Sequence, residues 1–171
     1  MSTIKFTKGQ GTGNDFVLIL DQDGSLDLSS TQAARICDRH FGIGADGLIR
    51  IVPSHLISEG KAALAEEASA YWFMDYRNAD GSIAEMCGNG IRVMARYLVD
   101  RGHQTSGIFS INTRDGAKYL ACPDTGDISV NLGKVAQEAG EITAANNGKV
   151  WTGLNINAGN PHAVVFVDDI S

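Results

Sequence analysis

Residues 90–101 have the sequence pattern of a strongly amphipathic helix, whereas most other patterned segments of the chain are typical of short strands. Apolar residues recur there at helical spacing and Gly102 stops the run, which predicts a helix over Gly90–Arg101. A second helix is predicted over Thr31–Arg39, and Lys61–Ala68 is either a third helix or an exposed insertion. The predicted strands are Ile4–Thr7, Phe16–Leu20, Leu48–Val52, Tyr71–Tyr76, Ile108–Asn112, Lys118–Ala121, Ile128–Leu132 and Ala163–Val167.

Cys87 stands immediately before the amphipathic run. At a helix N-terminus, free N–H groups and the positive end of the helix dipole favour thiolate over thiol, so Cys87 is a candidate base or nucleophile. The N–H groups that Gly88 and Gly90 leave uncovered can hold a carboxylate or a phosphate beside the sulfur. The alternative is a buried, unreactive thiol, which is the interpretation we favour for Cys37 and Cys122, because neither lies among glycines.

Composition excludes several classes of function. The chain has 171 residues, enough for one domain or slightly more, and its hydrophobic fraction of 43% is that of a globular protein. The net charge of −6, without any Lys/Arg-rich run, argues against a nucleic-acid partner. No run is long and apolar enough for a membrane span, and no signal peptide pattern is present, so we expect a cytoplasmic protein. Three cysteines without metal-ligand spacing predict neither a disulfide framework nor a metal site.

The C-terminal part of the chain repeats a pattern from its beginning. Gly13–Asp21 and Gly159–Asp168 each consist of a Gly-Asn turn, a buried-type strand and an aspartate. Ordinary turn chemistry produces such a pattern, but its recurrence at long spacing favours duplication of a domain. We therefore predict an N-terminal domain over residues 1–135, followed over residues 136–171 by a linker and the opening strands of a second, incomplete domain. Segment 136–149 is predicted to be a polar connection, and that second domain to hold only strands near Lys149–Asn155 and Ala163–Val167.

Five motifs, taken in order, resemble the signatures of the diaminopimelate epimerase family. Their order and spacing make the resemblance specific, whereas the Cys-Gly-Asn-Gly motif alone would be weak. The motifs are Gly11-Thr12-Gly13-Asn14-Asp15-Phe16, Cys37-Asp38-Arg39-His40-Phe41-Gly42-Ile43-Gly44-Ala45-Asp46-Gly47, Asn78-Ala79-Asp80-Gly81-Ser82, Met86-Cys87-Gly88-Asn89-Gly90-Ile91-Arg92 and Gly159-Asn160-Pro161-His162.

The resemblance implies an isomerase that interconverts LL- and meso-diaminopimelate, a precursor of lysine and peptidoglycan, without pyridoxal phosphate or a metal. In this family one cysteine removes the α-proton as a thiolate, and a second returns a proton to the opposite face as a thiol. Cys87 matches the first of the two. The implied fold is α+β, with two pseudo-symmetric domains that each wrap a curved, mostly antiparallel sheet around a central helix. Here that helix is Gly90–Arg101, buried through Ile91, Met94, Ala95 and Leu98.

The resemblance also assigns contacts to the substrate. Gly88 and Asn89 match the amides that hold the α-carboxylate, where negative charge develops during proton abstraction. The family match further implies substrate contacts from three asparagines and a residue that tunes thiol acidity. These are Asn14, Asn78 and Asn160 for the contacts and His162 for the tuning.

The chain departs from the family pattern at Gly47 and in the motifs of the family's second half. The family commonly has a glutamine or another residue that touches substrate where this chain has Gly47. The family's second half also supplies a Glu-Arg pair and a Cys-Gly-Thr-Gly helix start with the second cysteine, and neither is found before Ser171. We therefore expect a chain that lacks the second cysteine, with homodimer formation as a possibility that the family suggests.

Two alternatives to a diaminopimelate epimerase remain open. A proline or hydroxyproline racemase-type enzyme uses the same two-thiol logic, but such enzymes typically have histidine where this chain has Asn89. A non-catalytic module that binds amino acids or docks a subunit would keep Cys87 only as a relic. Thiol reactivity separates this module from the enzymes, because a relic reacts no faster than an ordinary thiol, whose pKa is about 8.5.

Overall fold

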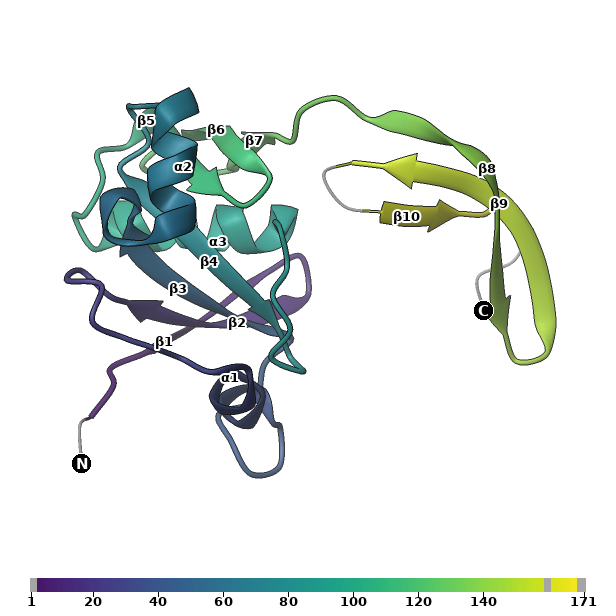
Figure 1. Cartoon of the computed structure of the whole chain (residues 1–171), viewed down its shortest axis with the longest axis horizontal. Coiled ribbons are helices and arrows are strands. Elements are labelled where there is room, and N and C mark those ends of the chain that lie inside the picture. Colours follow the sequence, from purple (N-terminus) through teal and green to yellow (C-terminus); the bar gives the residue numbers. More distant parts are fainter. Residues whose placement is uncertain (1–2, 159–160, 169–171) are drawn as a thin grey trace. The chain divides into compact units, whose positions relative to one another are not determined.

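The computed structural model describes residues 3–158 and 161–168. The chain divides into two compact units, Met1–Asn131 and Leu132–Ser171. The first unit is built from a sheet with three α-helices, and the second from a separate three-stranded sheet (Figure 1). We describe each unit by itself.

A seven-stranded sheet forms the framework of the first unit, and its strands follow one another in chain order. Neighbouring strands are antiparallel except for β2 with β3 and β4 with β5, so the sheet is the mostly antiparallel one of the expected α+β fold. The strands are β1 (Thr7–Gly11), β2 (Asn14–Leu20), β3 (Gly47–Pro53), β4 (Trp72–Asn78), β5 (Gly107–Thr113), β6 (Gly116–Cys122) and β7 (Ser129–Asn131). The helices are α1 (Ser30–Cys37), α2 (Ser58–Glu66), which follows the short 3-10 helix η1 (Ser54–Leu56), and α3 (Gly88–Asp100).

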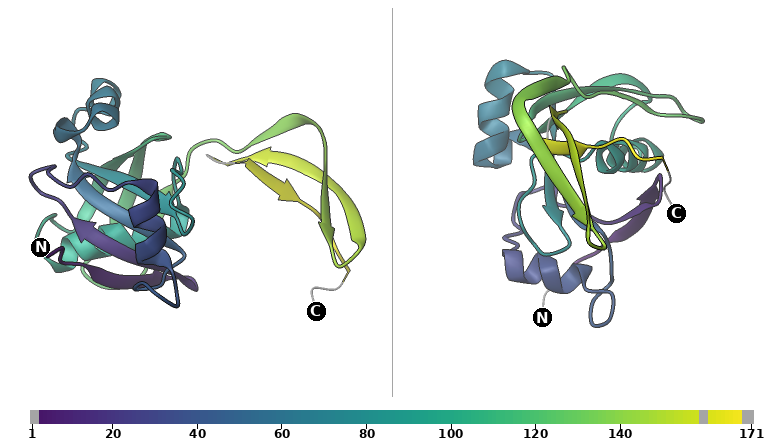
Figure 2. Two further views of the ribbon diagram at one scale, coloured as in Figure 1. Left: turned by 60° about the horizontal axis from the view of Figure 1, so that its bottom comes forward. Right: turned by 90° about the vertical axis from the view of Figure 1, so that its right-hand side faces the viewer.

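The amphipathic helix α3 lies inside the curve of this sheet (Figures 1 and 2). It contacts β1, β2 and β3 near one end of the strand order and β6 and β7 at the other, so the sheet bends around it. Its predicted apolar stripe is confirmed, because Ile91, Met94, Ala95 and Leu98 are each fully buried. Burial of such a stripe is the main source of stability for a helix of this length.

The period-2 alternation of the strands divides the core into two clusters. Phe16 and Leu18 of β2 pack with the stripe of α3, whereas Val17 and Ile19 pack with α1 on the other face of the sheet. The helix α2 also lies apart from α3 and contacts β5 and β6. The central strands are therefore covered on both faces, which explains their nearly continuous apolar sequences.

Helix α1 confirms the predicted helix at Thr31–Arg39 within one or two residues at each end. It begins after Ser29, which forms a capping box with Gln32: the Gln32 N–H donates to the Ser29 hydroxyl, and the Ser29 N–H donates to the Gln32 side chain. The strand predicted at Ile4–Thr7 is misplaced, because β1 begins only at Thr7. Pairing with β2 determines this boundary, starting from Thr7 opposite Leu18.

The second unit consists of three antiparallel strands in the order β10-β9-β8. These are β8 (Ala136–Asn146), β9 (Lys149–Asn157) and β10 (Pro161–Val164). The prediction of a polar connection over 136–149, and of only two strands in this part, is therefore wrong. Segment 136–149 is the first strand of a hairpin and its turn, in which Asn147 and Gly148 have positive φ. An Asn-Gly turn between two strands is a strong hairpin signal.

Candidate active site

Cys87 is the N-cap residue of α3, as the sequence pattern predicts. Its extended backbone leads into the helix, and its Sγ accepts a hydrogen bond from the Gly90 N–H at 3.4 Å. The Ile91 N–H donates to the Cys87 carbonyl at 2.9 Å. The cysteine side chain is half-buried, so its sulfur is held by the helix start without being sealed in the core.

Two backbone amides of the first turn remain beside this sulfur. The first N–H groups of a helix have no partner within the helix, and those of Gly90 and Ile91 are bonded to Cys87. Those of Gly88 and Asn89 have no hydrogen-bond acceptor among residues 3–158 and 161–168. Both residues are half-buried, and their free N–H groups lie at the positive end of the helix dipole. Such a pair of donors can bind a carboxylate.

The second glycine of the motif has a packing role. Gly90 is buried, and a Cβ added to it would lie 3.0 Å from Met74 Cε and 3.1 Å from Ile49 Cδ1. The absence of a side chain therefore lets the first turn of α3 lie directly against β3 and β4. This close approach is a reason for glycine at this position that the sequence argument, based on free amides, did not include.

Asn14 lies next to Asn89 although the two are distant in the sequence. Asn14 opens β2, and the Asn89 Nδ2 donates to the Asn14 Oδ1 at 2.6 Å. Arg92, one turn further along α3, donates to the Asn89 Oδ1 and to the Thr12 hydroxyl. The structure thus brings the predicted residues Asn14, Asn89 and Cys87 to one place, at the start of α3.

A cluster of charged side chains surrounds the beginning of β2. Arg39 Nη2 lies 2.6 Å from an Asp15 carboxylate oxygen and 2.7 Å from an Asp46 carboxylate oxygen, and Lys8 pairs with Asp15 at 2.7 Å. Hydrogen bonds from Arg39 and Lys8 hold the pKa of Asp15 well below its usual range. The pKa of Asp46 is lowered as well, first by the hydrogen bond from the Asn14 side chain and then by the Asp15 N–H. Both carboxylates are therefore ionised beside the candidate site.

The register of the sheet places Asn78 at the same edge as Asn14. Gly47, the first residue of β3, pairs with Phe16 of β2 on one side and with Asn78, the last residue of β4, on the other. The Asn78 side chain is exposed, and its Nδ2 donates to the Ser82 hydroxyl at 3.0 Å, which ties it to the turn that follows β4. Asn78 thus lies at the shared sheet edge but outside the contact between Asn14 and Asn89.

Tyr76 is a site neighbour that the sequence argument did not identify. It is 7% exposed, and its ring packs edge-on against Phe16 with centroids 6.2 Å apart. Burial raises the pKa of the Tyr76 hydroxyl, and the nearby Cys87 side chain raises it further. Strand alternation could have suggested this placement, because Tyr76 shares the helix-facing side of β4 with Trp72 and Met74.

The Tyr76 ring also explains the departure at Gly47. A Cβ at Gly47 would lie 2.5 Å from Tyr76 Cε2 and 2.8 Å from the Arg77 carbonyl oxygen. No side chain fits there while Tyr76 keeps its place. A glutamine side chain at this position would therefore collide with the Tyr76 ring.

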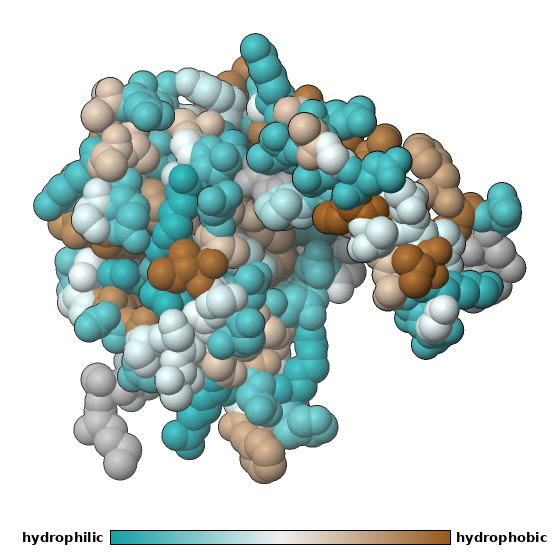
Figure 3. Space-filling view, turned by 45° about the vertical axis from the view of Figure 1, so that its right-hand side comes forward, coloured by the Kyte–Doolittle hydropathy of each residue, from teal (hydrophilic) through white to brown (hydrophobic). Residues whose placement is uncertain are grey.

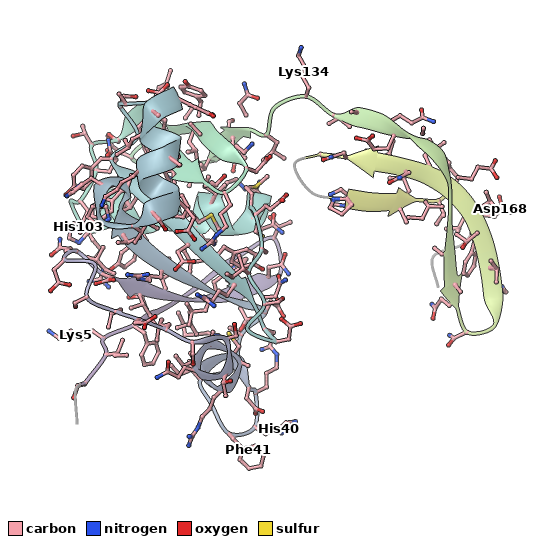
Figure 4. All side chains as sticks on the ribbon, viewed as in Figure 1. Lys5, His40, Phe41, His103, Lys134 and Asp168 are labelled. Atoms are coloured by element: carbon pink, nitrogen blue, oxygen red, sulfur yellow. The ribbon has the colours of Figure 1, made fainter. Side chains whose placement is uncertain are left out.

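The other cysteines are buried, as predicted. Cys37 is 2% exposed and Cys122 is 0% exposed, and burial raises the pKa of both thiols. Among the described residues, no three His, Cys, Asp or Glu side chains are grouped as a metal ion would require. Two of the histidines, His40 after α1 and His103 after α3, lie far apart in the first unit (Figure 4). No helix in the described part of the chain has the length and apolarity of a membrane span.

Two predicted site residues belong to the second unit. His162 lies on β10, opposite Ile156 of β9. Asn160 lies outside the described residues. The charged neighbours of the first unit were missed, although all four belong to the quoted motifs, because sequence alone does not tell which polar residues converge. These missed neighbours are Asp15, Arg39, Asp46 and Arg92.

The family model and the curated relatives agree on one family. The family model described as diaminopimelate epimerase matches residues 6–137. The chain is 47% identical over 171 residues to a diaminopimelate epimerase of Streptomyces coelicolor, covering 99% of this chain and 58% of that protein. It is 42% identical over 176 residues to one of Corynebacterium glutamicum, covering 99% of this chain and 60% of that protein.

A solved structure supports the same fold. A hydroxyproline epimerase from Agrobacterium vitis aligns with a TM-score of 0.67 at 11% identity, covering 94% of this chain and 50% of that one. At this identity the similarity concerns the fold alone. The chain spans 58% and 60% of the length of the two bacterial relatives above. With the family model matched over most of the chain and the helix-capping cysteine in place, this chain belongs to the diaminopimelate epimerase family.

Proposed function

We propose that this chain carries one acid/base half of a cytoplasmic enzyme that inverts the α-carbon of diaminopimelate. The observation that carries the proposal is Cys87 at the N-cap of α3, where its Sγ accepts the Gly90 N–H beside the unpartnered amides of Gly88 and Asn89. A base and an anion-binding pair of donors therefore stand next to each other. Relatives that share this part of the sequence are named diaminopimelate epimerase, which supports that substrate.

The proposed mechanism uses two thiols. The Cys87 thiolate takes the α-proton, and the electron pair left on the α-carbon is delocalised toward the α-carboxylate. Donors from Gly88 and Asn89 stabilise the charge that develops there. Inversion then requires a proton from the opposite face, delivered by a second thiol. Cys37 and Cys122 are buried in the core, so neither of them is placed to act as the second thiol.

The remaining site residues complete the proposal. Asn14 and Asn78, at one edge of the sheet, and Asn160 are proposed to contact the ammonium and carboxylate groups of substrate, because an amide offers donors and acceptors without a net charge. His162 is proposed to tune the acidity of the thiol pair. If His162→Ala leaves the pH–rate profile of an active enzyme unmoved, this role is wrong.

The test is solvent exchange at the α-carbon. The purified chain is incubated in deuterated water with LL- or meso-diaminopimelate, and loss of the α-proton signal and conversion between isomers are followed by NMR. We expect α-proton exchange that Cys87→Ser abolishes and that Cys37→Ala, a matched change at a buried thiol, retains. Conversion would mean that a second thiol is supplied in trans, and exchange without conversion would mean that Cys87 works as a half-site. No exchange with either isomer would contradict catalysis by this chain.

The same assay separates the two enzyme alternatives. Trans-4-hydroxy-L-proline and L-proline serve as competing substrates under identical conditions. Exchange with either of these, in the absence of exchange with diaminopimelate, would favour the proline racemase-type enzyme. Ordinary Cys87 reactivity together with the absence of any exchange would favour the non-catalytic module.

A further inference from the structure

Four side chains at the candidate site form a continuous series of hydrogen bonds. Arg92 donates to the Asn89 Oδ1, Asn89 Nδ2 donates to the Asn14 Oδ1 at 2.6 Å, and Asn14 Nδ2 donates to an Asp46 carboxylate oxygen at 3.1 Å. The series connects α3 with β2 and with the residue that precedes β3. We call these four residues, Arg92, Asn89, Asn14 and Asp46, the amide relay.

The two ends of the amide relay are chemically unambiguous. A guanidinium is only a donor, so the atom of Asn89 that faces Arg92 must be its oxygen. An ionised carboxylate is only an acceptor, so the atom of Asn14 that faces Asp46 must be its nitrogen. Side-chain amides are normally assigned from their hydrogen-bond partners, because oxygen and nitrogen have nearly the same shape. Here Arg92 at one end and Asp46 at the other determine which atom of each amide is oxygen and which is nitrogen. The hydrogen bond from Asn89 Nδ2 to Asn14 Oδ1 is consistent with both assignments.

A rotated amide would lose these bonds and create repulsion. If Asn14 turned over, its oxygen would face the Asp46 carboxylate and its nitrogen would face the nitrogen of Asn89. A turned Asn89 would present N–H groups to the Arg92 guanidinium. In the observed orientation, the NH2 groups of Asn14 and Asn89 each donate one hydrogen bond within the relay, and the second N–H of each can donate to another acceptor. We propose that Arg92 and Asp46 are positioning residues, which hold Asn89 and Asn14 so that each offers an N–H donor to substrate.

Both ends of the amide relay are themselves held in place. Asp46 also accepts from Arg39, and the N–H of Asp15 donates to it at 3.2 Å. The second hydrogen bond of Arg92 goes to Thr12, a β-branched residue with a positive φ of 54° in the turn between β1 and β2. Arg92 therefore ties the strained turn before Asn14 to the helix that carries Asn89.

The chemical consequence is a site half that is rich in donors. Together with the free N–H groups of Gly88 and Asn89, the relay amides present hydrogen-bond donors next to Cys87. Donors suit the carboxylate end of an amino acid, where negative charge grows during proton abstraction. This inference rests on the proposed function in one respect, namely that Asn14 and Asn89 contact substrate. The orientation of the amides is measurable without any substrate.

The experiment follows the side-chain NH2 groups of an isotope-labelled chain by NMR. Hydrogen exchange with solvent is measured for Asn14 and Asn89 in the wild type and in Asp46→Asn, Arg92→Met and Arg92→Lys. Asp46→Asn keeps the shape of the side chain but replaces a pure acceptor with a group that can also donate. The Asn78 NH2 group, which donates to Ser82, is an internal reference outside the relay. Asp23→Asn, at an exposed carboxylate, is the matched control for loss of charge.

We expect Asp46→Asn to speed exchange of the Asn14 NH2 group by up to about tenfold, because an amide oxygen is a weaker acceptor than a carboxylate. Arg92→Met should speed exchange of the Asn89 NH2 group, because no donor then holds the Asn89 oxygen in place. Arg92→Lys retains a donor and should keep exchange near the wild-type rate, and Asp23→Asn should change nothing. Unchanged exchange of Asn14 in a folded Asp46→Asn protein would overturn the proposal, as would equal effects of Arg92→Met and Arg92→Lys. If Arg92→Met does not fold, the isosteric Asp46→Asn decides. Because no substrate is present, a relay that fails is distinguishable from a chain that does not catalyse α-proton exchange.

Discussion

The three thiols of this chain have the same chemistry but different surroundings. Cys37 and Cys122 are buried and their pKa values are raised by burial, whereas Cys87 is half-buried at a helix start. We therefore expect iodoacetamide at neutral pH to label Cys87 first in the folded chain, because alkylation requires an accessible thiolate. Peptide mapping by mass spectrometry checks the order. Labelling of Cys37 or Cys122 at the same rate as Cys87 would contradict it, and denatured chain provides the control in which all three react.

The cluster around Asp15 predicts a dependence of stability on pH. Hydrogen bonds from Arg39 and Lys8 lower the pKa of Asp15 in the folded chain below its unfolded value, so the ionised form favours folding. This contribution is complete above the unfolded pKa of about 3.9 and is lost as the pH falls toward the folded value. Asp15→Asn should therefore lower stability most at neutral pH and least in acid. Urea unfolding at several pH values measures this difference, and a pH-independent difference would refute the linkage.

The close approach of Tyr76 to Gly47 predicts a costly substitution. In Gly47→Ala the new Cβ would overlap the Tyr76 ring and the Arg77 carbonyl, so we expect a loss of about 1–3 kcal/mol in unfolding free energy. Part of this loss should disappear in the double variant with Tyr76→Leu, because the ring is then absent. Chemical denaturation of the four proteins of this cycle gives the coupling energy. Simple additivity of the two substitutions would contradict a steric role for the ring.

The sequence predicted the reactive group of the site better than the hydrogen bonds between its residues. The position of Cys87 followed from the local sequence, because a residue that directly precedes a glycine and an amphipathic run is expected at the start of the helix. The pairing of Asn14 with Asn89 did not, because it depends on how β2 packs against α3. The same holds for Arg92 and Asp46. Such residues look like ordinary surface charges until the fold brings their partners to them.

At the scale of elements, local caps and turns determine where helices begin. The capping box of Ser29 and Gln32 satisfies N–H groups that α1 would otherwise leave free. Ser29→Ala should therefore lower the unfolding free energy by about 1 kcal/mol, and Ser29→Asp should retain most of the stability. Thermal unfolding of the two variants beside the wild type tests this expectation. Equal melting temperatures for Ser29→Ala and the wild type would show that the cap contributes nothing.

The longest element that sequence interpretation assigned wrongly is β8. Its sequence contains two glutamates, several alanines and Gly140, none of which is typical of a strand. Pairing with β9 forms it nonetheless, with an irregular register between Gln137 and Glu141 that accommodates the glycine. Propensity failed here because an edge strand draws its structure from its neighbour. The Asn-Gly turn at its end was the available signal, and it was interpreted as a linker.

At the scale of the whole molecule, the two units differ in how much they bury. No described residue of 132–168 is buried, and apolar side chains such as Val150, Leu154 and Phe166 are exposed. Apolar side chains are visible on the surface of this unit among hydrophilic ones (Figure 3). Two or three strands without a covering layer are marginally stable in water.

We therefore expect backbone amides of β8–β10 to exchange with solvent much faster than those of α3. Hydrogen exchange followed by mass spectrometry, at a concentration where sedimentation shows a monomer, tests this expectation. Local opening should dominate in the β8–β10 sheet, whereas α3 should exchange only through unfolding of the first unit. Equal protection of the two regions in the monomer would contradict the difference in burial.

The position of α3 between early and late strands also has a consequence for biosynthesis. The helix packs on β1, β2 and β3, which precede it, and on β6 and β7, which follow it. A growing chain in which α3 has just left the ribosome therefore lacks the part of the cover of α3 that β6 and β7 provide. Contacts of such long sequence separation form slowly. The nascent chain thus passes through a stage at which Cys87 is already synthesised while β6 and β7, which complete the cover of its helix, are not.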